Sequence, residues 1–218
     1  MSFFSALQPS ASGGVQVLAA LLLPLLATGF IALFRNRPNL REGATILTGI
    51  ALFSLVLSFW PEIMAGGRPS LTLAEPLPGI RLHLELEPLG YLFALVASFL
   101  WIVTTIYSIG YMRGHHEKNQ SRFYLFFAVA ISAAMGVAFA GNLFTLFLFY
   151  EVLTLCTFPL VTHHQTEEAR KAGRVYLGIL LGTSVGFQLL GILWVYLLAG
   201  TLDRLQSARL WLSRPGPP

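Results

Sequence analysis

Glu151 is the residue whose type and position most favour a chemical role, because it is the only acidic residue deep within a long apolar run. The run extends from Asn142 to Thr162, and at about 1.5 Å of helical rise per residue it places Glu151 near the middle of a bilayer. Burial favours the protonated form of a carboxyl group, whereas a nearby cation or water favours the ionised form. Small changes around Glu151 would therefore move its proton, and we predict that it carries protons across the membrane.

A structural role is the alternative, in which a protonated Glu151 donates one hydrogen bond to a neighbouring carbonyl or hydroxyl. Thr154, about one helical turn further on, is the candidate partner. Lys171 and Arg174, at the start of the next apolar run, are candidate auxiliary groups but lie too far along a helix to pair directly with Glu151. The sequence therefore leaves two sources of a partner: a lysine in helices outside this chain, or water and neutral donors. The neutral donors are Thr183, Ser184 and Gln188.

Two pairs of adjacent histidines, His115-His116 and His163-His164, lie near acidic residues. Adjacent helical residues point about 100° apart and lack the i,i+4 spacing of a helical metal site, so no metal site is expected. His163 and His164 follow the Glu151 run, where they could collect protons at the mouth of a proton path. Solvated loop residues are the simpler interpretation of both pairs.

The elements that position these residues are predicted to be membrane-spanning helices. Of 218 residues, 55% are hydrophobic and only 11% are charged, which suits a lipid-facing surface. The formal charge of +4 indicates basic loops and no nucleic-acid partner. A helix needs about 20 apolar residues to cross the hydrocarbon layer, where its backbone must be satisfied internally. The qualifying runs are Val15–Phe34, Gly43–Met64, Gly90–Met112, Arg122–Ala140, Asn142–Thr162 and Gly173–Ala199.

The basic residues predict an orientation, because nine of the fourteen fall on one side of these spans. The positive-inside rule places that side in the cytoplasm. The N-terminus and the loop 66–89 are then expected to face outward from the cell inner (plasma) membrane, although the basic tail argues for the opposite orientation. The nine residues are Arg35, Arg37, Arg41, Arg113, Lys118, Arg122, Arg170, Lys171 and Arg174.

The outward loop is predicted to form a β-hairpin, because Ile80–Glu87 strictly alternates apolar and polar residues. Leu82, Leu84 and Leu86 would share the face that packs against helix ends or a partner subunit, with His83 solvated on the other face. In the last apolar run, three glycines recur at four-residue spacing and predict a bare face for close helix packing. They are Gly178, Gly182 and Gly186.

Three segments together resemble a known family. They are Glu87–Phe93, Tyr107–Arg113 and, above all, Gly141–Phe144 through Phe149–Glu151. They resemble the antiporter-like subunits shared by respiratory complex I and Mrp-type cation/proton antiporters, with the D-type Mrp subunit as the nearest likeness. The resemblance runs from about Val15 to Thr201. Residues 1–201 are accordingly expected to be the N-terminal six-helix part of an antiporter-like domain, and residues 202–218 a basic tail that is interfacial or disordered.

The resemblance implies a proton-translocating subunit of about fourteen helices, in which a glutamate of the fifth helix works with lysines of the following helices. Glu151 matches that glutamate in context and helix number. The sixth-helix lysine would align near Val175, where this chain has valine with Arg174 beside it. The chain stops before the helix that carries the family's principal lysine, so we expect a truncated gene product, with one part of a split subunit as the alternative.

We therefore expect an all-α membrane protein of about six transmembrane helices with one extracytoplasmic β-hairpin. Its expected function is part of a proton-translocating subunit of a multisubunit monovalent cation/proton antiporter or complex I-like complex. A non-conducting scaffold or vestigial subunit is the alternative, and a membrane enzyme with Glu151 as general base lacks a nucleophile or metal set beside it.

No catalytic activity is expected from this chain alone. The sequence has neither a Gly-rich dinucleotide turn nor a Cys cluster, so no cofactor is expected, and any NADH:quinone oxidoreductase chemistry would belong to other subunits. The expected partners are the lipid bilayer, other membrane subunits, protons and, in an antiporter, Na+.

Overall fold

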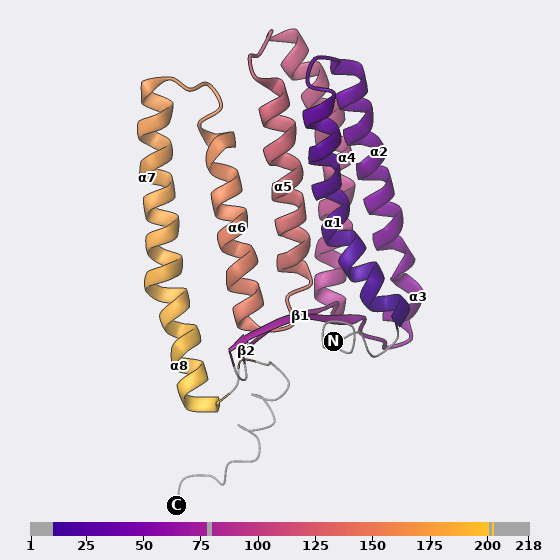
Figure 1. The fold of residues 1–218 in the computed structure, drawn as a ribbon, viewed down its shortest axis with the longest axis vertical. Helices are drawn as coiled ribbons and strands as arrows, with labels where there is room; N and C mark the ends of the chain where they lie inside the picture. The colour runs from indigo at the N-terminus through magenta and orange to yellow at the C-terminus, as the bar shows by residue number, and fades with distance from the viewer. Residues whose placement is uncertain (1–10, 78–79, 201, 203–218) are drawn as a thin grey trace, which may run out of the picture.

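The fold is a bundle of long helices with a two-stranded hairpin across one end (Figure 1). The computed structural model describes residues 11–77, 80–200 and 202. Within them, six helices are long and apolar enough to cross a membrane, as the sequence predicted. The spans are α1 (Ala11–Leu33), α2 (Pro38–Ser58) continued by α3 (Trp60–Met64), α4 (Pro88–Gly114), α5 (Gln120–Ala138), α6 (Leu143–Val161) and α7 (Glu167–Thr183). A π-helical turn, η1 (Ser184–Leu189), and α8 (Leu190–Ala199) continue α7 into the same rod.

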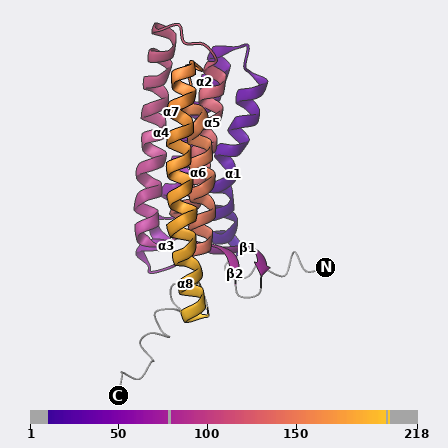
Figure 2. The ribbon, with the colours of Figure 1, turned by 90° about the vertical axis from the view of Figure 1, so that its left-hand side faces the viewer.

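The sixth span begins at Glu167, six residues before the predicted start at Gly173. The Thr166 side chain caps the helix by accepting a hydrogen bond from the Ala169 N–H at 3.1 Å. Glu167 and Glu168 fill the first turn, where negative charge complements the helix dipole. Apolar patterning alone missed this start because the capped turn is polar. At 33 residues the whole rod is about 50 Å long, more than the roughly 30 Å hydrocarbon layer, so its ends can extend beyond it (Figure 2).

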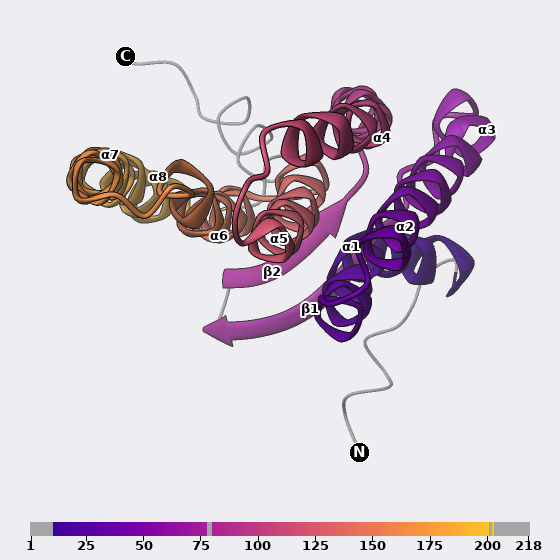
Figure 3. The ribbon, with the colours of Figure 1, turned by 90° about the horizontal axis from the view of Figure 1, so that it is seen from above.

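The helices pack unevenly around the bundle. Seen from above, α1, α2, α4 and α5 group together, while α6 and α7 extend to one side (Figure 3). The largest fully buried side chains include Trp101, Tyr124, Phe59 and Phe139, all within the four-helix group and its ends. α7 packs mainly on α6 and exposes most of its surface.

The two hairpin strands, β1 (Ser70–Leu77) and β2 (Ile80–Glu85), pair antiparallel, which confirms the predicted hairpin. Leu84 and Leu86 are fully buried, as expected for the apolar face. The opposite face differs from the solvated one that was expected, because His83 is half-buried where β2 meets the loop between α5 and α6. The Gly141 N–H donates to the His83 carbonyl at 2.9 Å, and the His83 ring shares a 2.9 Å hydrogen bond with Thr72 Oγ1.

The three connections α1–α2, α4–α5 and α6–α7 lie together at one end, here called the basic end, and the hairpin lies at the other (Figure 1). The nine basic residues named above lie in or next to these three connections. Arg68 and Arg81 lie at the hairpin end. The charge asymmetry of the sequence thus becomes an asymmetry between the ends of the bundle. Which end faces the cytoplasm remains a prediction.

Close helix approaches occur at other glycines than those predicted. A Cβ added at Gly178, Gly182 or Gly186 would meet nothing within 4 Å, so their shared face is unpacked in the described part of the chain. A Cβ at Gly136 would instead collide with the ring of Phe149, and one at Gly173 with Thr162. Glycine is thus required where α5 meets α6 and where α7 meets the end of α6. The predicted basic tail, residues 202–218, falls outside the described residues except for Leu202.

Candidate functional site

Glu151 lies one residue before Val152, the middle residue of α6. Its depth follows from the start of the helix, where the Asn142 side chain accepts a hydrogen bond from the Thr145 N–H at 2.8 Å. Asn142 is fully buried and donates through Nδ2 to the Arg81 carbonyl of the hairpin at 2.7 Å. The hairpin, the loop and the N-cap therefore hold the start of α6 in register and set Glu151 at mid-span.

Both carboxylate oxygens of Glu151 are buried and have no hydrogen-bond partner among the described residues. The hydrogen bond that a structural, protonated Glu151 would donate to Thr154 is not formed, although Thr154 itself is buried. Two of the other neutral donors are engaged within their own helix, since Thr183 Oγ1 and Ser184 Oγ each donate to a carbonyl one turn earlier at 2.9 Å. The described chain thus buries the Glu151 carboxyl group at membrane depth without a hydrogen bond or a counter-charge. Such burial costs free energy when the group is ionised.

A π-helical turn interrupts the neighbouring span and contacts α6. Such turns widen a helix by one residue and are frequent at functional sites. Nearer the basic end, Thr157 Oγ1 and Tyr176 OH approach to 3.5 Å, which places polar groups between Glu151 and the end of α6. These groups were not singled out from the sequence, because only the packing of α6 on α7 pairs them.

His163 and His164 meet Glu117 at the basic end. Glu117 Oε2 lies 3.9 Å from His163 Nε2 and 3.7 Å from His164 Nδ1. Burial lowers the pKa of His163, the nearby Arg122 guanidinium lowers it further, and Glu117 partly opposes them. The structure therefore brings together two sequence-predicted residues and an acid from the α4–α5 connection in one titratable cluster.

Lys171 and Arg174 lie on α7 and are exposed. Neither forms a salt bridge with Glu151 or with any other acid in the described part of the chain. Val175, near which the resemblance would align the family's sixth-helix lysine, is 57% exposed. The described residues 11–77 and 80–200 also contain no cluster of three or more His, Cys, Asp or Glu suited to a metal ion.

Sequence reasoning did not single out a buried ion-pair cluster near the start of α2. Arg41 and Glu42 are each only 3% exposed. Arg41 Nη2 lies 3.1 Å from Glu42 Oε1, and Arg113 Nη2 lies 2.5 Å from Glu42 Oε2. Arg41 also donates to Ser121 and its guanidinium stacks 4.9 Å above the Tyr124 ring. Pro38, which starts α2, was the signal that Arg41 and Glu42 belong to a helix.

A multi-pass helical membrane protein with an uncompensated acid at mid-span is the class that the fold and the site define. Two known protein families match parts of this chain. The family described as NADH:quinone oxidoreductase/Mrp antiporter, TM, matches residues 140–211, and the one described as NADH-Ubiquinone oxidoreductase (complex I), chain 5 N-terminus, matches residues 79–124. The chain belongs to the antiporter-like subunit family shared by Mrp antiporters and complex I.

Individual proteins and solved structures similar to this chain fit the same family. The Na(+)/H(+) antiporter subunit A1 of Staphylococcus aureus is 28% identical over 175 residues, which cover 79% of this chain and 22% of that protein. The archaeal membrane-bound sulfane sulfur reductase has a TM-score of 0.73 at 20% identity over 90% of this chain and 30% of the matched one. The Mrp complex of Dietzia sp. has a TM-score of 0.66 at 20% identity over 94% of this chain and 22% of the matched one.

These comparisons bear on the extent of the chain and correct the expected type of subunit. The chain spans only 22% of the length of the curated relatives it matches. Those relatives are A subunits, so the expected likeness to the D-type subunit is not supported.

Proposed function

We propose that this chain is part of a proton-translocating subunit of a multisubunit monovalent cation/proton antiporter or complex I-like membrane complex. Glu151 is the proton carrier, and the basic end faces the cytoplasm of the cell. The partners are other membrane subunits, with protons and Na+ as the transported ions. The family supports the class of complex, and the site supports the role of Glu151.

The observation that carries the proposal is the burial of both Glu151 oxygens, at mid-span, without a partner among the described residues. A structural acid in lipid is expected to be protonated and to donate a hydrogen bond, and no described group receives one here. A carrier needs the opposite arrangement. Its proton must be held weakly enough to leave when a water or a cation from another segment approaches.

The proposed path runs from the basic end inward. The cluster of Glu117, His163 and His164 collects protons, because imidazole is the side chain best suited to proton relay and the cluster lies where α6 ends. Glu151 lies eleven residues before Thr162, about 16 Å along the helix, so transfer between them needs intervening water. Thr157 and Tyr176 lie between these levels and can hold such water.

The test replaces Glu151 with Gln in the assembled complex and follows proton movement in everted membrane vesicles with a pH-sensitive dye. Adding Na+ or NADH in separate arms distinguishes cation-driven from redox-driven movement. Glu151→Gln should abolish the pH change in the active arm at unchanged subunit abundance. Glu168→Gln, an exposed change of the same chemistry on α7, is the matched control and should leave it intact. Normal proton movement in an assembled Glu151→Gln complex would establish the scaffold alternative.

A further inference from the structure

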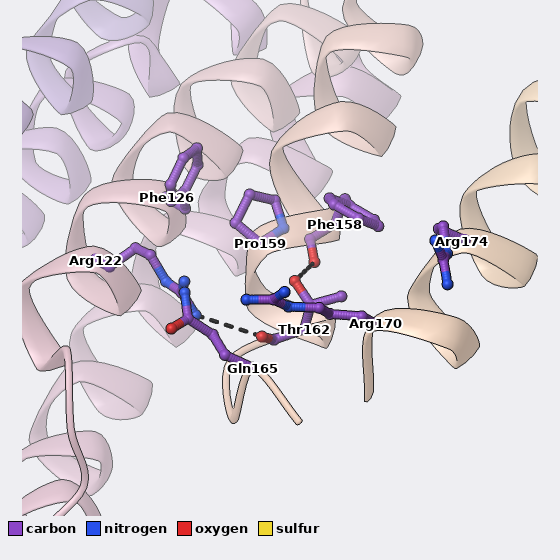
Figure 4. A pocket seen from close by; sticks show the side chains of 8 residues that line it. All are labelled: Arg122, Phe126, Phe158, Pro159, Thr162, Gln165, Arg170 and Arg174. Carbon is purple, nitrogen blue, oxygen red and sulfur yellow. Dashed lines mark hydrogen bonds between the residues drawn. The ribbon is translucent and has the colours of Figure 1, made fainter. Parts of the chain in front are cut away.

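A cavity of about 450 Å³ opens between α5, α6 and α7 at the basic end (Figure 4). Three arginines from two helices line it: Arg122 from α5, and Arg170 and Arg174 from α7. None of the described residues that line it is acidic. Its lining residues include neither Glu151 nor any member of the Glu117, His163 and His164 cluster, although Arg122 borders that cluster.

The positive charge in this cavity is not neutralised by the described protein. Arg170 and Arg174 form no salt bridge with any acid in residues 11–77 or 80–200. Arg122 Nη2 donates to the His163 carbonyl at 2.8 Å, which is a neutral acceptor, and its Nε is buried without a partner. Three guanidinium groups around one hollow, with no counter-charge, create a strongly positive potential that favours an anion.

The cavity is also amphipathic along the membrane normal. Phe126 lies one helical turn deeper on α5 than Arg122, and Phe158 lies one turn deeper on α6 than Thr162. Pro159 completes this apolar wall, as Figure 4 shows beside the two phenylalanines. Arg122 and Arg170 lie closer to the basic end than this apolar wall, and Arg174 lies level with it (Figure 4), an arrangement that matches a molecule with an anionic head and a hydrocarbon tail. A small free anion would use only the upper half.

We propose that this cavity binds an anionic phospholipid, with its phosphate held by Arg122, Arg170 and Arg174 and an acyl chain lying against Phe126 and Phe158. Guanidinium groups suit phosphate because they bind two of its oxygens at once, and basic pockets between transmembrane helices recognise lipid headgroups in this way. The lipid would fasten α7 to α5 and α6. That attachment matters because α7 is otherwise held mainly by α6.

The test measures lipid binding to the purified, delipidated full chain in detergent. The probes are phosphatidylglycerol, phosphatidylcholine and inorganic phosphate, and bound lipid is counted by native mass spectrometry. Phosphatidylglycerol should bind more tightly than phosphatidylcholine. Arg170→Gln with Arg174→Gln should weaken it roughly 25-fold at low salt, from about five-fold per arginine. Arg35→Gln with Arg37→Gln is the matched control, since it removes the same charge from exposed positions at the same end.

Retention of phosphatidylglycerol by the pocket variant, or equal loss in both double variants, would overturn the proposal. Inorganic phosphate that displaces phosphatidylglycerol at equal concentration would assign the site to a free phosphate and would also overturn it. Should the pocket variant fail to fold, a photoreactive phosphatidylglycerol on the wild-type chain decides the question. It should label residues 158–174, and labelling only elsewhere refutes the assignment.

Discussion

Glu42→Gln is predicted to destabilise the bundle strongly, because it removes the only acid that pairs with the buried guanidinium of Arg41 in the described chain. Arg41 is 3% exposed and lies 3.1 Å from Glu42, with neutral Ser121 and Gln120 as its other side-chain partners. Removing one member of a buried ion pair costs about 3–5 kcal/mol, mostly as the penalty of an uncompensated buried charge. The Arg113 side chain is 47% exposed and can return to water, so we expect the lower end, about 3 kcal/mol.

Denaturant unfolding in detergent micelles, followed by circular dichroism, measures this loss. Glu168→Gln is the matched control on an exposed helix turn and should cost under about 1 kcal/mol, the usual scale of a charge near a helix end. The double variant Arg41→Gln with Glu42→Gln should be less destabilised than the sum of the single variants, because neither charge is left alone. Equal unfolding free energies for Glu42→Gln and Glu168→Gln would refute the argument that the pair is buried and uncompensated without its acid.

Three further outcomes are expected. Burial lowers the pKa of His163, so the unfolded chain binds a proton on this residue at higher pH than the folded chain does. The contribution of neutral His163 to the free energy of unfolding is therefore fully present above about pH 6.5 and falls as the pH drops below that value. His163→Gln should flatten this pH dependence of the unfolding midpoint. Gly136→Val should destabilise by about 1–3 kcal/mol through collision with Phe149, whereas Gly182→Ala, on the open face, should be neutral or slightly stabilising in the same unfolding assay. Leu84→Ala should cost about 2–5 kcal/mol, and loss of hairpin protection in hydrogen exchange would report it.

The spans could be predicted from sequence because a bilayer demands long apolar runs whose backbone is satisfied within the helix. The sixth span was placed six residues late for the same reason. Its first turns are polar, and the Thr166 cap with Glu167 and Glu168 makes them helical without any apolar signal. An apolar run predicts the part of a helix that lies within the hydrocarbon layer, but it does not predict the polar turns that continue the helix beyond that layer.

The depth of Glu151 was predictable from its position in one run, but its surroundings were not. Thr154 had the right spacing for a hydrogen bond, yet spacing along one helix does not determine which way a carboxyl group turns. The burial of Glu42 was not predicted because its partner Arg113 is 71 residues away and only packing joins them. Likewise Gly136 packs against a neighbouring helix and Gly182 does not, although the sequence shows each only as a glycine within a helix.

The most direct test of the account is to observe the protonation of Glu151 itself. Infrared difference spectra of vesicles holding the assembled complex, recorded as the outer pH is stepped, should show a carboxyl band that appears and disappears reversibly. That band should be missing in Glu151→Gln and retained in Glu168→Gln, which would identify Glu151 as the group that takes up and releases the proton. A wild-type spectrum whose carboxyl changes all persist in Glu151→Gln would contradict the central claim.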